Sequence, residues 1–238
     1  MIIANHGIIA SSGMITTTLN ESLYAVYKAE SNANDSFSTY NGTAQGGLTY
    51  STGKSGNAFT FNGSNAYVNY ADNAFNFTGD FSVNLWVNIA SSTTNSVFIS
   101  NYFFQGGLGE AGYILEHTSA GNIRFYMLVT PSVATQLNYS YAGKYSGWHM
   151  LTLTKVGGVG ACKMYIDGAL VVNNNPTGAI YYNSFNYSTI GVAKYVGGAS
   201  GYVENGGKID EVGLWNKELT STEITELYNS GSGKFYPY

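Results

Sequence analysis

The side chains that could carry acid–base chemistry are sparse in this sequence. Of its 238 residues, 14 are Asp or Glu and 3 are His. A glycosidase needs two carboxylates about 5–10 Å apart, but Asp210 and Glu211 are adjacent, and adjacent strand residues point to opposite faces. Glu110 and Glu116 are six residues apart in a stretch interrupted by glycines. The sequence has no serine-hydrolase, zinc-protease or phosphate-loop motif, so we expect no enzymatic activity.

Three oxygen-bearing residues could instead hold a cation. Calcium takes carboxylate and carbonyl oxygens from loops rich in Asp, Asn and Gly. Asn34 and Asp35 follow a predicted first strand at 24–29, and Asp210 lies in a predicted last strand at 207–215. First and last strands are often neighbours in an antiparallel sandwich, so these residues could share a calcium ion. The alternative is that Asp35 closes an Asx turn and Asp210 is a hydrogen-bonded edge residue.

Tyrosine and asparagine concentrate in two loop stretches, 139–145 and 181–187. Aromatic rings stack on the C–H faces of sugars, and amide side chains supply both donors and acceptors for hydroxyl groups. We expect a ligand-binding site formed by Tyr141, Tyr145, Tyr181, Tyr182, Asn183 and Tyr187. The alternative is that these aromatic side chains pack under their own loops or in a subunit interface, where tyrosine is also enriched.

Low charge limits the classes of partner. Only 10% of the residues are charged, against about 25% in a typical domain, and the net charge is −4. A basic patch for nucleic-acid phosphates is therefore not expected. No apolar run approaches the roughly 20 residues of a membrane helix, and the first basic residue is Lys28, so we expect neither a secretory signal nor membrane insertion. Such a surface suits neutral sugars or close packing against other protein chains.

The hydrophobic pattern of the chain is that of β-structure. Apolar residues alternate with polar ones over 81–89, 123–129 and 162–166, which places one apolar face on each strand. Asp167 and Gly168 form a two-residue hairpin signal after the last of these. Further strands are expected at 57–61, 66–70, 96–100, 112–116, 148–155 and 188–193. Short strands between Gly, Asn and Ser turns predict an all-β antiparallel sandwich with one face of each sheet exposed to water.

One short helix is predicted near the C-terminus. Thr220 and Glu223 have the spacing of a capping box, in which each side chain bonds the backbone amide of the other. Leu219 and Ile224 on either side of the cap can form a hydrophobic staple. The pattern predicts a helix over 221–229 that stops near Gly231.

The first 22 residues differ from the rest because they sustain no strand alternation. The segment nevertheless carries the isoleucines Ile2, Ile3, Ile8, Ile9 and Ile15. Several exposed isoleucines would be unusual on a free tail. We therefore expect residues 1–22 to be an N-terminal docking arm and residues 23–238 to be one domain, with a frayed terminus as the alternative.

Several segments, in order from about residue 24 to 230, resemble the laminin-G-like branch of the concanavalin A-like lectin/glucanase superfamily. They include N-A-N-D-S-F-S-T-Y-N-G-T, G-K-S-G-N-A-F-T-F-N-G-S-N-A-Y-V, F-S-V-N-L-W-V, W-H-M-L-T-L-T, M-Y-I-D-G and G-K-I-D-E-V-G-L-W-N-K-E-L-T-S-T-E-I. The resemblance implies a jelly-roll sandwich and a structural calcium held by Asp210 with Asn34 or Asp35. Hydrolases of the family carry an E-x-D-x-E-type strand, which K-I-D-E-V does not match, so the resemblance implies a non-catalytic member.

Members of this family are mostly glycan- or protein-recognition modules. With an apolar N-terminal arm, the chain resembles a bacteriophage virion protein such as a fibre, tail or capsid-surface component, and an extracellular or cell-surface location is the alternative. The resemblance implies a glycan-binding adhesin that recognises a cell-surface glycan, contacts other virion proteins through residues 1–22, and forms a homo-oligomer. The alternative is a purely structural virion protein that mediates assembly without binding sugar.

Overall fold

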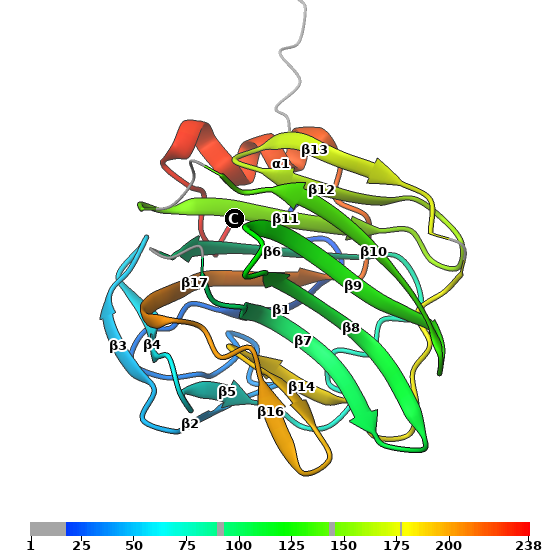
Figure 1. Ribbon diagram of the computed structural model, residues 1–238. Coiled ribbons are helices and arrows are strands. Elements are labelled where there is room, and N and C mark those ends of the chain that lie inside the picture. The colour runs from blue at the N-terminus through cyan, green and yellow to red at the C-terminus, as the bar shows by residue number, and fades with distance from the viewer. Residues whose placement is uncertain (1–17, 90–92, 143–145, 177) are drawn as a thin grey trace, which may run out of the picture.

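The computed structural model describes residues 18–89, 93–142, 146–176 and 178–238, which form two antiparallel sheets packed face to face (Figure 1). The first sheet has the order β13 (Ala169–Asn174), β12 (Cys162–Ile166), β11 (His149–Lys155), β6 (Phe81–Asn88), β17 (Asn205–Trp215), β4 (Asn57–Asn62) and β3 (Thr49–Thr52), and β1 (Leu23–Tyr27) also pairs with β17. The second has the order β10 (Val133–Ser140), β9 (Asn122–Thr130), β8 (Gly109–His117), β7 (Ser96–Gln105), β14 (Tyr187–Ile190), β5 (Tyr67–Asn69) and β2 (Thr43–Gln45). The predicted antiparallel sandwich is confirmed.

A small hairpin, β15 (Ala193–Tyr195) and β16 (Gly198–Ser200), lies on the outer face of the second sheet. Ala193 packs there against Val97 and Ile114, so the hairpin covers the outer face of β7. The amide of Val196 in the hairpin turn donates to the carbonyl of Phe104 at 3.0 Å, which fixes the hairpin to the end of β7. Among the described residues, no helix is long and apolar enough to cross a bilayer.

The main core lies between the two sheets, where the predicted alternation places it. Val83 and Leu85 of β6 face Phe125 and Met127 of β9 in one buried cluster. The prediction that each sheet has one exposed face is wrong for β6, because the helix covers the other side of this strand. Trp86 there is buried and stacks 6.0 Å from the ring of Tyr228.

The helix α1 (Ser221–Tyr228) begins as predicted. The Glu223 amide donates to Thr220 Oγ1 at 3.2 Å, and the Thr220 amide donates to Glu223 Oε2 at 2.8 Å. The helix ends at Asn229, which has the left-handed φ of 45° typical of a C-cap, and a 3₁₀ turn, η1 (Asn229–Gly231), follows.

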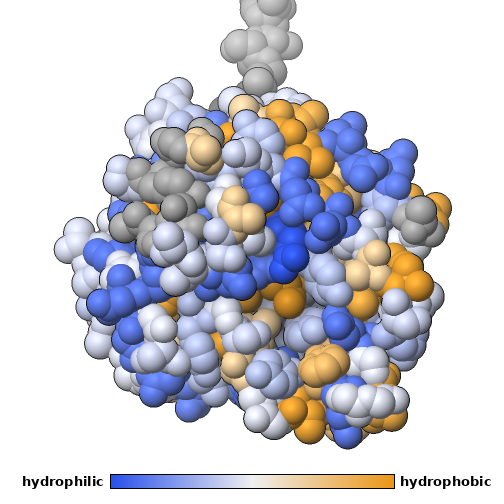
Figure 2. Space-filling model, in the orientation of Figure 1, coloured by the Kyte–Doolittle hydropathy of each residue, from blue (hydrophilic) through white to orange (hydrophobic). Residues whose placement is uncertain are grey.

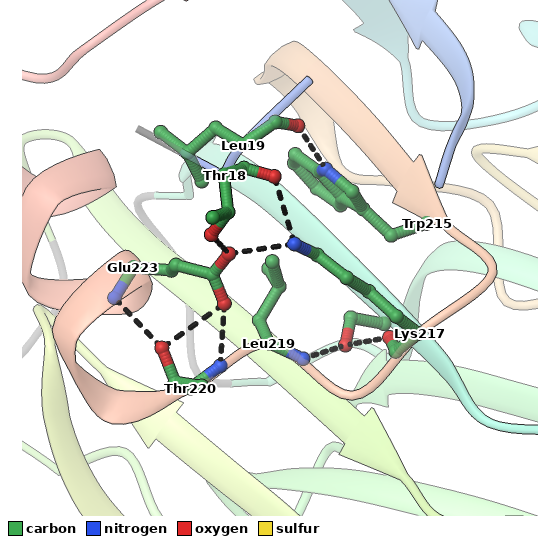
Figure 3. A network of polar contacts seen from close by, with 8 residues as sticks. Thr18, Leu19, Trp215, Lys217, Leu219, Thr220 and Glu223 are labelled. Carbon is green, nitrogen blue, oxygen red and sulfur yellow. Dashed lines mark hydrogen bonds and ion pairs between the residues drawn. The ribbon is translucent and has the colours of Figure 1, made fainter. Parts of the chain in front are cut away.

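The chain enters the domain through a polar latch beside this helix (Figure 3). Trp215 Nε1 donates to the Leu19 carbonyl at 2.7 Å, and Lys217 Nζ donates to the Thr18 carbonyl at 2.8 Å. Leu19 is fully buried against Trp215 and the helix. Residues 18–22 of the predicted arm therefore pack on the domain. Residues 1–17 lie outside the described residues, and their docking role stays a prediction.

Candidate functional site

The six residues predicted to bind a ligand do not gather in one place. Tyr145 lies outside the described residues. Tyr141 has no exposed surface and packs edge-on between His117 and His149, with ring centroids 5.9 and 5.8 Å away. A side chain without exposed surface does not touch a ligand, so Tyr141 belongs to the core and not to a binding site. Tyr141 therefore fits the alternative in which the aromatic side chains of these loops pack within the protein.

Tyr182 and Tyr187 also contact other residues of this chain. The Tyr182 hydroxyl donates to the Phe77 carbonyl and accepts from the Phe77 amide, both at 3.2 Å. Burial raises the pKa of Tyr182, which fits a hydroxyl held within the protein. Tyr187 lies on the outer face of the second sheet with Lys194 Nζ 4.8 Å from its ring centroid.

Tyr181 and Asn183 do lie together, in a pocket of about 400 Å³ at one end of the sandwich. The pocket forms where the loop 181–187 passes the turn between β7 and β8, at the lower right of Figure 1. We name it the rim pocket, and it is lined by Phe103, Gln105, Leu108, Glu110, Tyr181, Asn183, Ser184 and Phe185.

Hydrogen bonds fix the loop over this pocket. The Tyr181 amide donates to the Leu128 carbonyl, and its carbonyl accepts from the Gly112 amide, each at 2.7 Å. The Asn183 carboxamide oxygen accepts from the Phe185 amide at 2.8 Å, which closes an Asx turn. Asn186 Oδ1 in turn accepts from the Asn183 amide at 3.1 Å. The loop therefore presents its side chains from a backbone that is held at both ends.

The walls of the rim pocket combine apolar surface with a few polar groups. Leu108 and Phe185 are 65% and 64% exposed, whereas Phe103 closes the back of the pocket and is nearly buried. Gln105 and Asn183 bring amide groups to the same space. Apolar walls with a small number of placed polar groups are typical of sites for small ligands.

Glu110 lines the edge of the rim pocket as a fixed hydrogen-bond acceptor. Tyr126 donates its hydroxyl to Glu110 Oε2 at 2.8 Å, and burial together with this bond raises the pKa of Tyr126 to about 12. Glu116 is the next carboxylate along β8 and bonds Arg124. A strand rise of about 3.3 Å per residue separates Glu110 and Glu116 by roughly 20 Å, beyond the spacing of a glycosidase pair.

The residues predicted to share a calcium ion already accept backbone amides. Asp35 accepts from Val26 through Oδ1 at 3.0 Å and from Thr39 through Oδ2 at 3.1 Å. Asp210 Oδ2 accepts from the amide of Lys54 at 2.7 Å. Both carboxylates therefore serve backbone hydrogen bonds, but Asp35 accepts from Thr39 four residues on, which is not an Asx turn, and Asp210 is fully buried in the central strand β17, so it is not an edge residue.

Three further observations concern these positions, and none of them shows the predicted ligands sharing a calcium ion. Asn34 is exposed in the loop beside Asp35. Burial raises the pKa of Asp210 to about 7, although backbone amides oppose the shift. Within the parts of the chain that the structure describes, no cluster of three or more His, Cys, Asp or Glu residues could hold a metal ion. The shared calcium site stays a prediction.

The chain matches a known family over most of its length. Residues 62–225 match the family model described as "Concanavalin A-like lectin/glucanases superfamily". The chain belongs to this superfamily. Among curated proteins, no sequence matches it.

Solved structures of the same fold include parts of bacterial toxins. The receptor-binding domain of botulinum neurotoxin C/D mosaic serotype aligns at a TM-score of 0.69 and 18% identity, covering 88% of this chain and 51% of that one. The binding domain of botulinum neurotoxin DC in complex with SialylT aligns at 0.67 and 18%, covering 89% and 52%. The same domain in complex with rat synaptotagmin II aligns at 0.66 and 19%, covering 89% and 52%. The chain therefore spans about half the length of these domains, and the likeness is one of fold.

Sequence reasoning missed several residues of the rim pocket. Phe185 lies within the tyrosine-rich stretch 181–187, and its apolar ring in a polar loop was an available signal. Leu108 is an isolated apolar residue in the turn Gly106-Gly107-Leu108-Gly109, a place where a large side chain is seldom buried. Gln105 carried no signal, since its position at the pocket depends on where β7 ends.

Proposed function

We propose that this domain is a non-catalytic glycan-binding adhesion module and that the rim pocket receives the sugar. The observation that carries the proposal is the pocket itself, in which exposed Phe185 and Leu108 stand beside the amides of Gln105 and Asn183. A sugar presents C–H faces and hydroxyl groups together, so it needs apolar and amide surface side by side. Tyr181 adds a second partly exposed ring to the same wall.

Two further observations support a glycan ligand. Glu110 is the charged residue that lines the rim pocket, and its carboxylate accepts from the Tyr126 hydroxyl. A solved structure of the same fold, the binding domain of botulinum neurotoxin DC, is a complex with SialylT, so this fold can belong to a sugar-binding protein. Such a module acts at a cell surface or outside the cell, where its glycan is displayed.

The setting that we propose for the domain is a bacteriophage virion, as a fibre, tail or capsid-surface protein. Residues 1–17 of the predicted 1–22 arm would dock onto other virion proteins, since residues 18–22 pack on the domain, and several copies of the domain would be displayed on each particle as a homo-oligomer. The burial of Leu19 supports this role, because a load on the arm is passed to the core of the domain. Low surface charge is consistent with close packing between copies.

The second candidate is a purely structural virion protein that binds no sugar. The observation in its favour is that Tyr141 and Tyr182 serve packing, so part of the tyrosine content needs no ligand. The binding domain of botulinum neurotoxin DC, which has the same fold, also forms a complex with rat synaptotagmin II, a protein partner. In this case the exposed rim of the pocket would contact a neighbouring chain.

A glycan array with matched variants separates the two candidates. Wild-type protein is displayed as multimers on streptavidin and applied beside Phe185→Ala, Leu108→Ala and the control Val159→Ala. Val159 is 65% exposed on a loop outside the rim pocket, so its substitution removes similar apolar surface elsewhere. We expect the two pocket variants to lose about tenfold or more in affinity for the sugars that wild type binds, and the control to match wild type. A blank array with wild-type protein would favour the structural candidate.

A further inference from the structure

A second hollow lies on the outer face of the second sheet, at the opposite end of β8 and β9 from the rim pocket. It has a volume of about 330 Å³, and we name it the amide hollow. The residues that line it are Asn95, Thr118, Ser119, Ala120, Asn122, Arg124, Gln136 and Asn138. Figure 2 views this face and shows hydrophilic residues gathered over the start of β9 and the end of β10. The lining is almost entirely amides and hydroxyls.

Three amide side chains in this hollow are not used by the fold. Asn122, Gln136 and Asn138 make no side-chain hydrogen bond to any part of the chain that the structure describes, whereas Asn95 Oδ1 accepts from the Ser119 amide at 2.7 Å. Gln136 and Asn138 are exposed and lie two residues apart on one face of β10. Each free carboxamide offers two donors and one acceptor, so the row is equipped for a ligand with many hydroxyl groups.

The hollow is electrically neutral despite its arginine. Arg124 Nε donates to Glu116 Oε1 at 2.8 Å, and its Nη2 bonds the same oxygen. Glu116 is 4% exposed, so this ion pair fixes the guanidinium at the sheet and balances its charge locally. An anionic ligand would find no uncompensated cation here, and the lining offers little surface to an apolar one.

Tyr126 connects the amide hollow to the rim pocket. Its ring lies 5.5 Å from the Arg124 guanidinium, and its hydroxyl reaches Glu110 of the rim pocket at 2.8 Å. Arg124 and Tyr126 are alternate residues of β9 and so share the outer face, about 7 Å apart. Across the ladder, Asn138 pairs with Arg124 and Gln136 with Tyr126. One strip of the sheet therefore runs from free amides to a half-buried aromatic ring and on to the edge of the rim pocket.

We propose that the amide hollow is a second subsite for the same ligand, a neutral linear oligosaccharide that lies along the outer face of β9 with one end in the rim pocket. This inference rests on the proposed function and adds the ligand class. The hydroxyls of the distal sugars pair with Asn122, Gln136 and Asn138, and a ring between the two sites stacks near Tyr126. A single sugar fills only one of the two sites.

The test uses neutral linear oligosaccharides of one to eight units, printed as length series on an array, with binding constants then measured by calorimetry. The variant Gln136→Ala/Asn138→Ala removes two exposed amides, and Asn173→Ala removes an exposed amide from β13 at the edge of the other sheet. For wild type and the control, we expect affinity to rise with chain length. We expect the double variant to bind the longest chains about tenfold more weakly and to keep wild-type affinity for the short ones.

Three results would overturn the inference or its basis, and they are distinguishable. Wild-type binding that does not rise with length overturns the second subsite and leaves the proposed function standing. Equal binding of long chains by wild type and the double variant does the same. No binding of any sugar by wild type overturns the proposed function itself. As a direct readout, the side-chain NH₂ signals of Gln136 and Asn138 should shift in NMR spectra when the longest bound sugar is added.

Discussion

Tyr182 and Phe185 lie three residues apart in one loop, yet the structure gives them opposite roles. The Tyr182 hydroxyl bonds the Phe77 backbone beneath the loop, whereas Phe185 is 64% exposed at the rim pocket. The difference comes from which way the backbone turns between them, since the Asx turn at Asn183 redirects the chain. A residue type therefore marks this loop as a candidate, but only the turn geometry decides which aromatic ring meets a ligand.

Substitution of these two residues should separate stability from binding. Tyr182→Ala leaves a cavity and should lower the free energy of unfolding by about 3–5 kcal/mol, and Tyr182→Phe, which removes the hydroxyl alone, by about 1 kcal/mol. Phe185→Ala should change it by less than about 0.5 kcal/mol, because the ring is mostly in solvent. Urea unfolding of the three variants checks this. Equal destabilisation by Tyr182→Ala and Phe185→Ala would mean that both rings pack in the core.

The calcium prediction also belongs to single residues. If Asp210 shares a calcium ion with Asn34 and Asp35, added Ca²⁺ should raise the melting temperature and a chelator should lower it, because a ligand that binds only the folded state stabilises it by mass action. Asp210→Asn should remove this response. Differential scanning fluorimetry in calcium and in chelator measures it, with Asp72→Asn as an exposed control. Identical melting of wild type in both buffers would leave Asp35 and Asp210 as loop-closing residues only.

At the scale of elements, the latch ties the chain entry to helix α1. Glu223 is 5% exposed and receives hydrogen bonds from Thr220, Lys217 and Thr18. Burial alone would raise the pKa of this carboxyl, but the bonds from Lys217, Thr18 and Thr220 lower it to about 2. Two segments that are distant in sequence, the chain entry at Thr18 and the stretch 217–223, meet at one ionised side chain, so the charge of that side chain supports the packing of both.

The pH dependence of this latch has a definite sign. A carboxyl whose pKa is lower in the folded state stabilises the fold above its unfolded pKa of about 4.3, and the contribution is lost as pH falls toward 2. Glu223→Gln should therefore cost about 2 kcal/mol at pH 7, the size of hydrogen bonds to a charged group, and close to nothing near pH 2. Urea unfolding of wild type and variant at several pH values measures the difference, with Glu21→Gln as a control. A cost that is independent of pH would mean that the charge of Glu223 is not what holds the latch.

The elements differ in how far sequence predicts them. Helix α1 was predictable because its capping box is a local signal between residues three apart. The strand β6 was predictable by alternation, but the burial of its second face was not, since the cover comes from a helix more than 130 residues away. The edge strand β10 escaped prediction because most of its residues are exposed and only Leu137 and Tyr139 pack against the core. The amide hollow depends on that strand and so could not be foreseen.

For the whole molecule, Leu19 ties the start of the described chain to the core of the domain. Deletion of residues 1–17 should leave the melting temperature nearly unchanged. Deletion of residues 1–22 should lower it clearly, because it removes the buried Leu19 side chain and the acceptor for Trp215, at a cost of about 3–4 kcal/mol. Thermal melts of both truncations give the answer. Pull-downs on assembled particles test docking separately. If deletion of residues 1–17 is enough to abolish attachment, docking belongs to residues 1–17. If the protein without residues 1–17 still attaches, the arm hypothesis is wrong.

Whole-molecule charge sets how adhesion should respond to salt and to copy number. Only 10% of the residues are charged; Arg124 of the amide hollow is ion-paired with Glu116, and Glu110 of the rim pocket accepts a hydrogen bond from the Tyr126 hydroxyl. A neutral sugar exchanges its hydrogen bonds with water for similar ones with protein and buries little apolar area, so each domain should bind weakly. Several tethered copies should bind far more tightly, because the second contact forms at a high effective concentration. Binding of monomer and streptavidin tetramer to a glycan surface, measured at 50 and 500 mM salt, should show a gain of about 100-fold or more with copy number and little change with salt. A steep fall with salt would indicate instead that charged groups outside these pockets make the contact.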